Sequence, residues 1–399
     1  MKLSKAFLCV ASIVASTIST SPGWASGPGV SSMIYADLAA WAEFRANNPA
    51  AQTTDDENSA EFAPNLIERR FRVAAARFKD EWGDLPQNKL TPGPVLRLGA
   101  KNERVAAVRV RLGMPATNVF DAQLAQRIAA YRSAHGLPDG ELVDATLLAS
   151  LNLGHAHYAR LIDINIKRST QFPANPGERF VLVDSAEQRL YLYENGIVTD
   201  TMKVVVGKAS DQTPMLAGFI SYAVLNPYWN VPPDLVRERY VARIVDAGES
   251  YLGTRGFEVL SGWEDDARVL SYSEVDWDAV RAGQADVWLR QKPGAGNGMG
   301  RVKFMFPNRY GVYLHDTPSR ALFDQDRRLE SAGCVRVERP WDLARWLFGK
   351  DLTWKGRPDA QRVNLPEPVP VYLTYFTAVP TADGFDFRPD VYGKDRLPI

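Results

Sequence analysis

Short segments rich in β-branched and aromatic residues, separated by turn residues, occupy the chain from about residue 178 onward. Residues 189–193 and 201–206 are two of these segments, and Asn195-Gly196 lies between them. Asn-Gly between two such segments is a strong signal for a β-hairpin. The pattern therefore predicts a mostly-β domain over residues 178–399. Further strand signals lie at residues 180–183, 219–224, 301–306, 312–314 and 370–376.

Within this domain the pattern changes to charged segments in which apolar residues such as Tyr240 and Ile244 recur at helical spacing. Two prolines precede these segments, and a glycine-rich stretch at residues 292–298 follows them. We therefore expect a helical insertion over about residues 234–289, which can close over an active site as a lid. A plain connecting loop is the alternative interpretation of the glycine-rich stretch.

The first 25 residues have the features of a secretory signal peptide. Lys2 and Lys5 precede an apolar run at residues 6–16, and small residues lead to a cleavage site after Ala25. The run is shorter than the roughly 18 to 20 residues that cross a bilayer. We therefore expect export, cleavage, and a mature protein without a membrane span. An uncleaved anchor is the alternative.

Helical patterns fill the chain between the signal peptide and the mostly-β domain. A break at residues 91–94 (Thr-Pro-Gly-Pro) separates a helical scaffold region, residues 26–94, from a compact module at residues 95–153. Apolar residues recur at helical spacing in two helices of this module, and a third helix opens near Asp144. Residues 154–177 form a scaffold helix and a linker. The other predicted helices span residues 32–46, 60–84 and 155–169, and the periodic module residues are Val105, Val108, Leu112, Leu124, Ile128 and Tyr131.

Charge and histidine content argue against two classes of function. The chain has 47 basic and 47 acidic residues, so nothing in its net charge favours binding to nucleic acid. The four histidines, at positions 135, 155, 157 and 315, do not form a ligand set with other residues. We therefore expect neither a metal nor another cofactor.

The mature chain would keep a single cysteine, Cys334, because Cys9 lies in the signal peptide. An unpaired thiol in an oxidising compartment calls for a function, although a buried inert cysteine is the alternative. Attack on an amide requires the thiolate, and a free thiol with a pKa of about 8.5 is mostly protonated at neutral pH. An adjacent imidazole is the usual base. His315, at the end of a predicted strand, is the histidine that we assign to this role.

The sequence around Cys334 predicts how it is presented. Gly333 lets the backbone turn sharply, and we expect the N–H groups of Gly333 and Cys334 to form an oxyanion hole. Arg336 lies two residues further, on the same extended face, where it either binds a substrate carboxylate or fixes the loop. Ser331 is a further candidate for substrate contact.

Two residues beside His315 are expected to have different roles. Tyr313 shares the face of His315 on the predicted strand and is a candidate to line the substrate pocket. Asp316 is adjacent in sequence, and neighbouring side chains of an extended segment point to opposite faces. We therefore do not expect the Asp316 carboxylate to orient His315, and a backbone carbonyl can accept the other ring N–H instead.

The combination of His315, a spacer and Ser331-Ala332-Gly333-Cys334-Val335-Arg336 resembles the catalytic signature of L,D-transpeptidases, the YkuD-type domain. Many members carry a second histidine at the position of Ala332, so this chain lacks one polar contact. Residues 226–233, 300–308 and 369–372 are similar to a large periplasmic subgroup that has a capping insertion. Residues 95–153, with the sequence His-Gly-Leu-Pro-Asp-Gly at residues 135–140, resemble the peptidoglycan-binding type 1 domain.

The resemblance implies an α+β multidomain protein. Its parts would be a mostly-β, YkuD-like sandwich with a helical lid, a small three-helix peptidoglycan-binding module and a helical N-terminal scaffold. It also implies a periplasmic enzyme in which Cys334 forms a thioester with a tetrapeptide donor of peptidoglycan. An amine on a stem-peptide acceptor then takes the acyl group, which gives a 3-3 cross-link. Acylation of Cys334 by some carbapenems is a further implication.

Two other functions stay open from the sequence. With water as the acceptor, the same Cys334 and His315 would make a carboxypeptidase or amidase that cuts stem peptides or releases proteins attached to them. A non-catalytic scaffold that binds peptidoglycan through residues 95–153 is the second alternative.

Overall fold

The structure, a computed structural model, describes residues 65–264, 266–353 and 359–396. All of them lie in the compact unit Thr54–Ile399. The predicted signal peptide at residues 1–25 and the predicted helix at residues 32–46 lie outside the described residues. No helix in the described part is both long and apolar enough to cross a membrane.

In the part of the chain that the structure describes, five helices precede the mostly-β domain. The residues whose helical spacing predicted the helices between positions 95 and 153 are all buried, from Val105 at 0% exposed to Tyr131 at 2%. Asn102, Asp121 and Asp144 each accept a backbone N–H bond at a helix start, which explains where these helices begin. The helices are α2 (Leu66–Trp82), α3 (Glu103–Arg111), α4 (Ala122–Ala134), α5 (Ala145–Leu153) and α6 (His155–Ser169).

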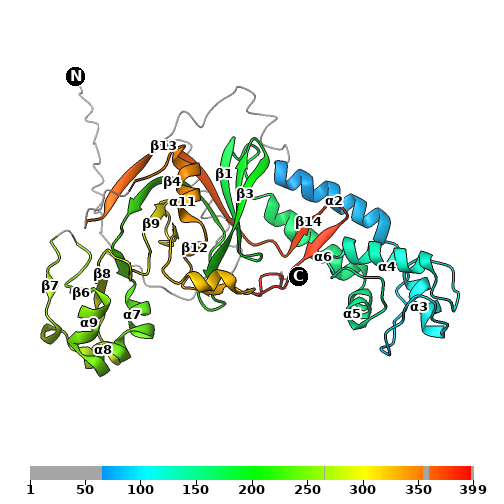
Figure 1. The fold of residues 1–399 in the computed structure, drawn as a ribbon, viewed down its shortest axis with the longest axis horizontal. Coiled ribbons are helices and arrows are strands. Elements are labelled where there is room, and N and C mark those ends of the chain that lie inside the picture. The colour runs from blue at the N-terminus through cyan, green and yellow to red at the C-terminus, as the bar shows by residue number, and fades with distance from the viewer. Residues whose placement is uncertain (1–64, 265, 354–358, 397–399) are drawn as a thin grey trace, which may run out of the picture. The chain divides into compact units, whose positions relative to one another are not determined.

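Nine strands form one sheet, and eight of them close into a ring, while β11 pairs only with β3 (Figure 1). Their order is β11-β3-β12-β10-β9-β4-β13-β1-β2, and β2 also pairs with β3. The strands are β1 (Arg179–Asp184), β2 (Arg189–Glu194), β3 (Ile197–Gly207), β4 (Leu216–Leu225), β9 (Val302–Met305), β10 (Leu314–His315), β11 (Leu329–Ser331), β12 (Val335–Val337) and β13 (Gln361–Thr374).

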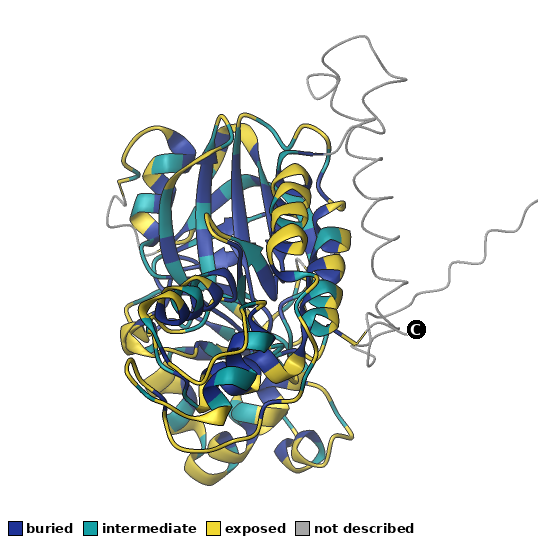
Figure 2. Cartoon of the chain, turned by 90° about the vertical axis from the view of Figure 1, so that its right-hand side faces the viewer, coloured by how far each residue is buried: buried dark blue, intermediate teal, exposed yellow. Residues whose placement is uncertain are grey.

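The closed ring differs from the sandwich that the resemblance implied, in which two separate sheets pack face to face. The 11-residue strand β3 is long enough to pair with β2 along one part and with β12 further on. Apolar residues of the strands fill the ring, together with Leu343 and Leu347 of α11 (Pro340–Phe348). Figure 2 shows buried residues along these strands and exposed residues on the outer faces of the helices.

The predicted insertion has a core of its own, which contains Val236, Ile244 and Leu289. It is not purely helical, because it includes a four-stranded sheet of order β5-β8-β6-β7. The prediction of a purely helical insertion is therefore wrong. Its strands were not predicted because they have only two to four residues, too few to show a clear alternating pattern. The elements are β5 (Trp229–Val231), α7 (Pro233–Arg239), α8 (Val241–Ala247), α9 (Glu249–Arg255), β6 (Phe257–Leu260), β7 (Val269–Leu270), η2 (Tyr272–Glu274), α10 (Trp277–Arg281) and β8 (Trp288–Gln291).

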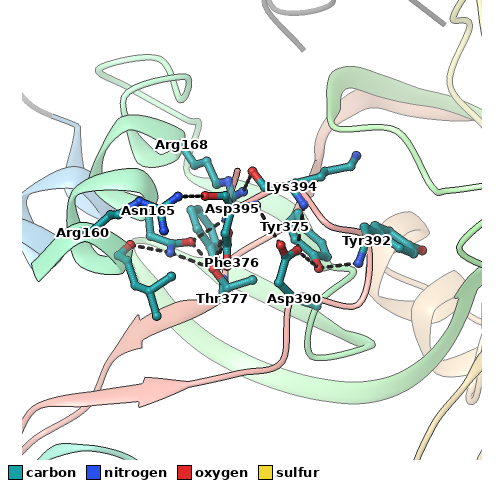
Figure 3. A network of polar contacts seen from close by, with 12 residues as sticks. Arg160, Asn165, Arg168, Tyr375, Phe376, Thr377, Asp390, Tyr392, Lys394 and Asp395 are labelled. Atoms are coloured by element: carbon teal, nitrogen blue, oxygen red, sulfur yellow. Dashed lines mark hydrogen bonds and ion pairs between the residues drawn. The ribbon is translucent and has the colours of Figure 1, made fainter. Parts of the chain in front are cut away.

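The C-terminal residues join the helices to the ring. The hairpin of β14 (Ala378–Pro380) and β15 (Phe385–Phe387) packs against α2 and α6. Figure 3 shows the polar network beside it, in which Arg168 of α6 forms a 2.9 Å ion pair with Asp395. Both side chains are almost fully buried. Helix α6 and the C-terminal segment are therefore fixed to each other by specific contacts.

Candidate active site

The candidate base ends strand β10, and the candidate nucleophile directly precedes the neighbouring parallel strand β12. Leu314 of β10 pairs with Val335 of β12, and His315 pairs with Arg336. Leu314 and Val335 are fully buried in the core of the ring. Side chains of paired residues point to the same face and alternate along a strand, so the next positions point out of the ring. The residues on this outer face are Tyr313, His315, Cys334 and Arg336, which the sequence analysis placed in the site.

A short turn, residues 331–334, presents the thiol, and we call it the nucleophile turn. Gly333 has φ of +100°, a conformation that residues with a Cβ rarely adopt. The Ser331 hydroxyl accepts a 3.2 Å bond from the Gly333 N–H and donates a 2.5 Å bond to the Cys334 carbonyl. The side chain of Ser331 thus closes the turn on itself.

These contacts change the roles predicted for two residues. Ser331 is 2% exposed and bonds to the nucleophile turn, so the predicted substrate contact does not fit its position. The Gly333 N–H already has an acceptor in Ser331, so it is not free to bind an oxyanion. The backbone N–H of Cys334 is the predicted oxyanion donor that this geometry leaves.

Thr213 is a residue of this site that the sequence analysis did not find. Its hydroxyl donates a 2.9 Å bond to the Gly333 carbonyl and accepts a 2.9 Å bond from the Gly207 N–H. Thr213 is 1% exposed, so the two bonds are shielded from water. A single threonine between strands carries no sequence signal for such a role.

His315 is oriented by a backbone carbonyl. Its Nδ1 lies 2.5 Å from the carbonyl oxygen of Asp316. A carbonyl only accepts, so Nδ1 carries the proton and Nε2 is the basic atom. The Asp316 carboxylate instead accepts the Arg301 N–H at 2.8 Å, which agrees with the expectation that it does not orient the imidazole.

His315 is neutral at physiological pH. Burial lowers its pKa to about 3, and the positive charges of Arg336 and Lys303 act in the same direction, against the bond to Asp316. A neutral imidazole can accept a proton from a nearby thiol. His315 is therefore in the protonation state that a general base needs, while its low pKa makes it a weak base in the free enzyme.

Cys334 is a free, half-buried cysteine whose thiol is protonated at rest. Burial raises its pKa, and hydrogen bonds from the backbone N–H and hydroxyl of Tyr313 oppose this effect, as do the charges of Arg336 and Lys303. The pKa of the thiol is raised while that of His315 is lowered. The resting pair is therefore thiol and imidazole, and the thiolate has to form during the reaction.

Lys303 is a second residue that the sequence analysis missed. It pairs with His315 across β9 and β10, so both side chains lie on the outer face. Its Nζ lies 5.3 Å from the centre of the Tyr313 ring. The signal in the sequence was a lysine between the buried residues Val302 and Phe304, at the alternate position that faces the site.

The insertion borders the nucleophile turn. Ala332 of the turn packs against the hydrophobic core of the insertion. Arg336 lies close enough to Arg239 and Tyr240, at the end of α7, for their charges to affect its pKa. Burial is the larger cause of the lowered pKa of Arg336. Ala332, whose position is histidine in many similar proteins, thus makes an apolar contact with the insertion.

The described residues contain no group of three or more histidine, cysteine, aspartate or glutamate side chains placed to hold a metal ion. The chemistry that the site can support from its own side chains is acyl transfer. A thiol, a neutral imidazole and nearby cations are the components that this chemistry requires.

Comparisons with known proteins agree with this reading. Residues 178–359 match the family model of YkuD, described as the L,D-transpeptidase catalytic domain. A candidate L,D-transpeptidase of Haemophilus influenzae is 31% identical over 224 residues, which cover 54% of this chain and 44% of that protein. The match thus spans less than half of the relative's length. The family model assigns residues 178–359, with both Cys334 and His315, to this catalytic domain.

Solved L,D-transpeptidases are more distant. One from Mycobacterium smegmatis is 14% identical, covers 49% of this chain and 58% of its own, and has a TM-score of 0.25. A mutant enzyme of Enterococcus faecium is 13% identical, with coverages of 51% and 52% and a TM-score of 0.24. Because these identities and TM-scores are low, the assignment of residues 178–359 to the L,D-transpeptidase catalytic domain rests on the family model and on the Haemophilus influenzae relative.

Proposed function

We propose, starting from the L,D-transpeptidase catalytic domain at residues 178–359, that this protein forms 3-3 cross-links between peptidoglycan stem peptides through a Cys334 thioester. The observation that carries the proposal is the arrangement of Cys334 and His315. His315 ends β10, Cys334 directly precedes the neighbouring parallel strand β12, and the basic Nε2 of a neutral imidazole is available. A thiol beside such a base is the minimum that covalent acyl transfer requires.

The first step attaches the donor to the enzyme. Nε2 of His315 takes the thiol proton as the sulfur attacks the carbonyl carbon of the third residue of a tetrapeptide. The carbon–sulfur bond forms, and the Cys334 N–H stabilises the oxyanion. When the carbon–nitrogen bond breaks, His315 gives its proton to the leaving amine of the terminal D-alanine. The product is a thioester and free D-alanine.

The second step transfers the acyl group. The side-chain amine of a diamino acid on a neighbouring stem attacks the thioester carbonyl, and His315 accepts a proton from that amine. The carbon–sulfur bond breaks and the thiol is restored. Water would give a hydrolytic product instead, so a site that closes favours transfer. The insertion beside the nucleophile turn supports this choice.

The remaining parts of the proposal concern place and partners. The signal sequence at residues 1–25 would export the protein to the periplasm. There the module at residues 95–153 would hold peptidoglycan, while the site takes a tetrapeptide donor and a stem-peptide acceptor. A carbapenem would acylate the same thiol, because its strained carbonyl is open to attack by the Cys334 sulfur.

Mass spectrometry of disaccharide tetrapeptide incubated with the mature protein and with Cys334→Ala tests the reaction. Dimers that lack one D-alanine, formed by the wild type alone, are the expected result. Tripeptide monomers without dimers would indicate the hydrolase instead. If neither product forms and the protein still binds intact peptidoglycan, the protein is a scaffold.

A further inference from the structure

Three neighbouring strands place two cations beside the base. Lys303 of β9 pairs with His315 of β10, and His315 pairs with Arg336 of β12. The three side chains therefore form one row across the outer face of the sheet, with the imidazole between the two cations. In the next row, Tyr313 lies beside Cys334, since the Tyr313 carbonyl accepts the N–H of Val335.

Neither cation has an acidic partner among the described residues. No carboxylate lies within ion-pair distance of Lys303 or Arg336, and the Nε atom of Arg336 is buried without a hydrogen-bond partner. Burial lowers the pKa of both groups, which shows that the surroundings disfavour their charges. Arg239, from the insertion, adds a third positive charge near Arg336, and the Glu330 carboxylate, which forms no ion pair with Arg336, partly opposes it.

Other buried basic residues of the ring are not arranged in this way. Arg328 is 6% exposed, and its guanidinium donates to the carbonyls of Val204, Gln188 and Gln325. Arg301, two residues before Lys303 on the same strand edge, bonds the side chain of Asn226 at 3.2 Å. Arg328 and Arg301 thus have acceptors for their guanidinium groups, and the absence of an ion-pair partner for Lys303 and Arg336 among the described residues beside the candidate base favours a role in binding.

In the free enzyme no anion among the described residues neutralises the charges of Lys303 and Arg336, so a bound substrate is the expected source of one. The thiol of Cys334 is protonated at rest, so it does not compensate the two charges in the free enzyme. An unpaired, partly buried cation is costly, and a charge-assisted bond to a carboxylate would offset that cost. A carboxylate is also the charged group that stem peptides carry at their ends.

We infer that Lys303 and Arg336 form a subsite for a carboxylate of the donor peptide, and that this carboxylate belongs to the D-amino acid that leaves. The inference rests on the proposed function. His315 protonates the leaving amine, so that amine must lie at the imidazole. The carboxylate of the leaving residue is two bonds from the same nitrogen, which places it beside the cations in the row.

The side-chain carboxylate of the diamino acid at the third position is the other source of this chemistry. Three donors separate the two sources: the free tetrapeptide, the tetrapeptide with a C-terminal amide, and the tetrapeptide amidated on the diamino acid. Binding to Cys334→Ala by calorimetry measures recognition without turnover, and acyl-enzyme formation by wild-type protein measures reaction.

The expected result is that the free tetrapeptide binds about 10- to 100-fold more tightly than its C-terminal amide, which is typical of a charge-assisted bond. Lys303→Met should remove most of this preference and leave binding of the amide unchanged, whereas Lys303→Arg should keep it. Lys292→Met is the matched control, because Lys292 is paired with Glu258 in the insertion. It should keep the full preference.

Three outcomes would overturn the inference. Equal losses of acyl-enzyme formation for all donors in Lys303→Met would mean that Lys303 acts on the thiol or the imidazole and not on a donor carboxylate. A preference lost only with the diamino acid amide would move the subsite to the other carboxylate. Equal binding of all three donors to Cys334→Ala would exclude the subsite. A donor preference in binding without acyl-enzyme formation would instead contradict the proposed reaction and leave the subsite standing.

Discussion

The hydroxyl of Thr213 donates a 2.9 Å hydrogen bond to the carbonyl oxygen of Gly333, the residue before the candidate nucleophile. The same hydroxyl accepts the Gly207 N–H from the end of β3. Thr213 therefore ties the nucleophile turn to a long strand of the ring, and its contacts are buried. A residue far from Cys334 in sequence helps to set the position of the sulfur.

Thr213→Val keeps the shape of this side chain and removes its hydroxyl. We expect the free energy of unfolding to fall by about 1 to 3 kcal/mol, because two buried backbone groups lose their partner. The rate of acyl-enzyme formation should fall about 10-fold with little change in KM, since the turn moves and the substrate contacts stay. Thr213→Ser should restore both quantities. A rise in KM alone would place Thr213 in substrate binding instead.

Ser331→Ala tests the role that the structure gives to this serine. The hydroxyl bonds the Gly333 N–H and the Cys334 carbonyl, so its loss should lower kcat several-fold and leave KM unchanged. Steady-state kinetics on donors of different length provide the measurement. The sequence-based prediction of a substrate contact would instead be supported by a KM that rises for long donors and a constant kcat.

The pH dependence of Cys334 alkylation reports the resting state of the pair. Burial raises the pKa of the thiol, so the rate with iodoacetamide should rise with a midpoint above about 8.5. Lys303→Met should move the midpoint higher, because one of the charges that favour the thiolate is removed. A rate that is already maximal near pH 6 would indicate a preformed thiolate–imidazolium pair and contradict this state.

Local patterns in the sequence predicted what local chemistry determines. The spacing of Val105, Val108 and Leu112 predicted a helix that the structure contains, and Asn195-Gly196 predicted the turn between β2 and β3. The unpaired Cys334 and the strand-end His315 were singled out as candidates because their residue types are informative alone, and their catalytic roles stay predictions. The helix and the turn are each determined by interactions between residues that lie close together in the sequence.

Pairing between distant strands could not be predicted in the same way. Closure of the ring depends on β3 contacting both β2 and β12, and the row of Lys303, His315 and Arg336 depends on the register of three strands. Registers follow from the packing of the whole core rather than from any one segment. The contact between Thr213 and Gly333, which lie 120 residues apart, was missed for the same reason.

His315 should make stability depend on pH. Its pKa is about 3 in the folded protein and about 6.5 in an unfolded chain, so the unfolded state binds the proton first as the pH falls. The stabilisation is complete above about pH 6.5 and is lost progressively toward pH 3, by on the order of 4 kcal/mol. Urea unfolding of wild type and His315→Asn at several pH values isolates this contribution. Equal pH dependence in both proteins would mean that His315 titrates normally.

The C-terminal segment contacts the end of β3, to which Thr213 ties the nucleophile turn. The Tyr392 hydroxyl donates a 2.6 Å bond to the Gly207 carbonyl, and its ring stacks on Tyr375 at 5.0 Å. Tyr375 in turn bonds Asp390. Further along, the carboxylate of Asp395 pairs with Arg168 of α6. Polar and ring contacts thus run from α6 to Tyr392 (Figure 3), which contacts Gly207.

Tyr392→Phe should lower the rate of acyl-enzyme formation a few-fold while KM stays constant, because it frees the Gly207 end of the Thr213 contact. Tyr222→Phe is the matched control, since the Tyr222 ring lies against Arg362, away from the turn.

Arg168→Met leaves Asp395 buried without its partner and should cost about 3 to 5 kcal/mol of stability. If the network acts as one unit, the two substitutions together should change the acylation rate by less than the product of their separate effects. Independent effects on the rate would show that Arg168 stabilises the fold without positioning Cys334.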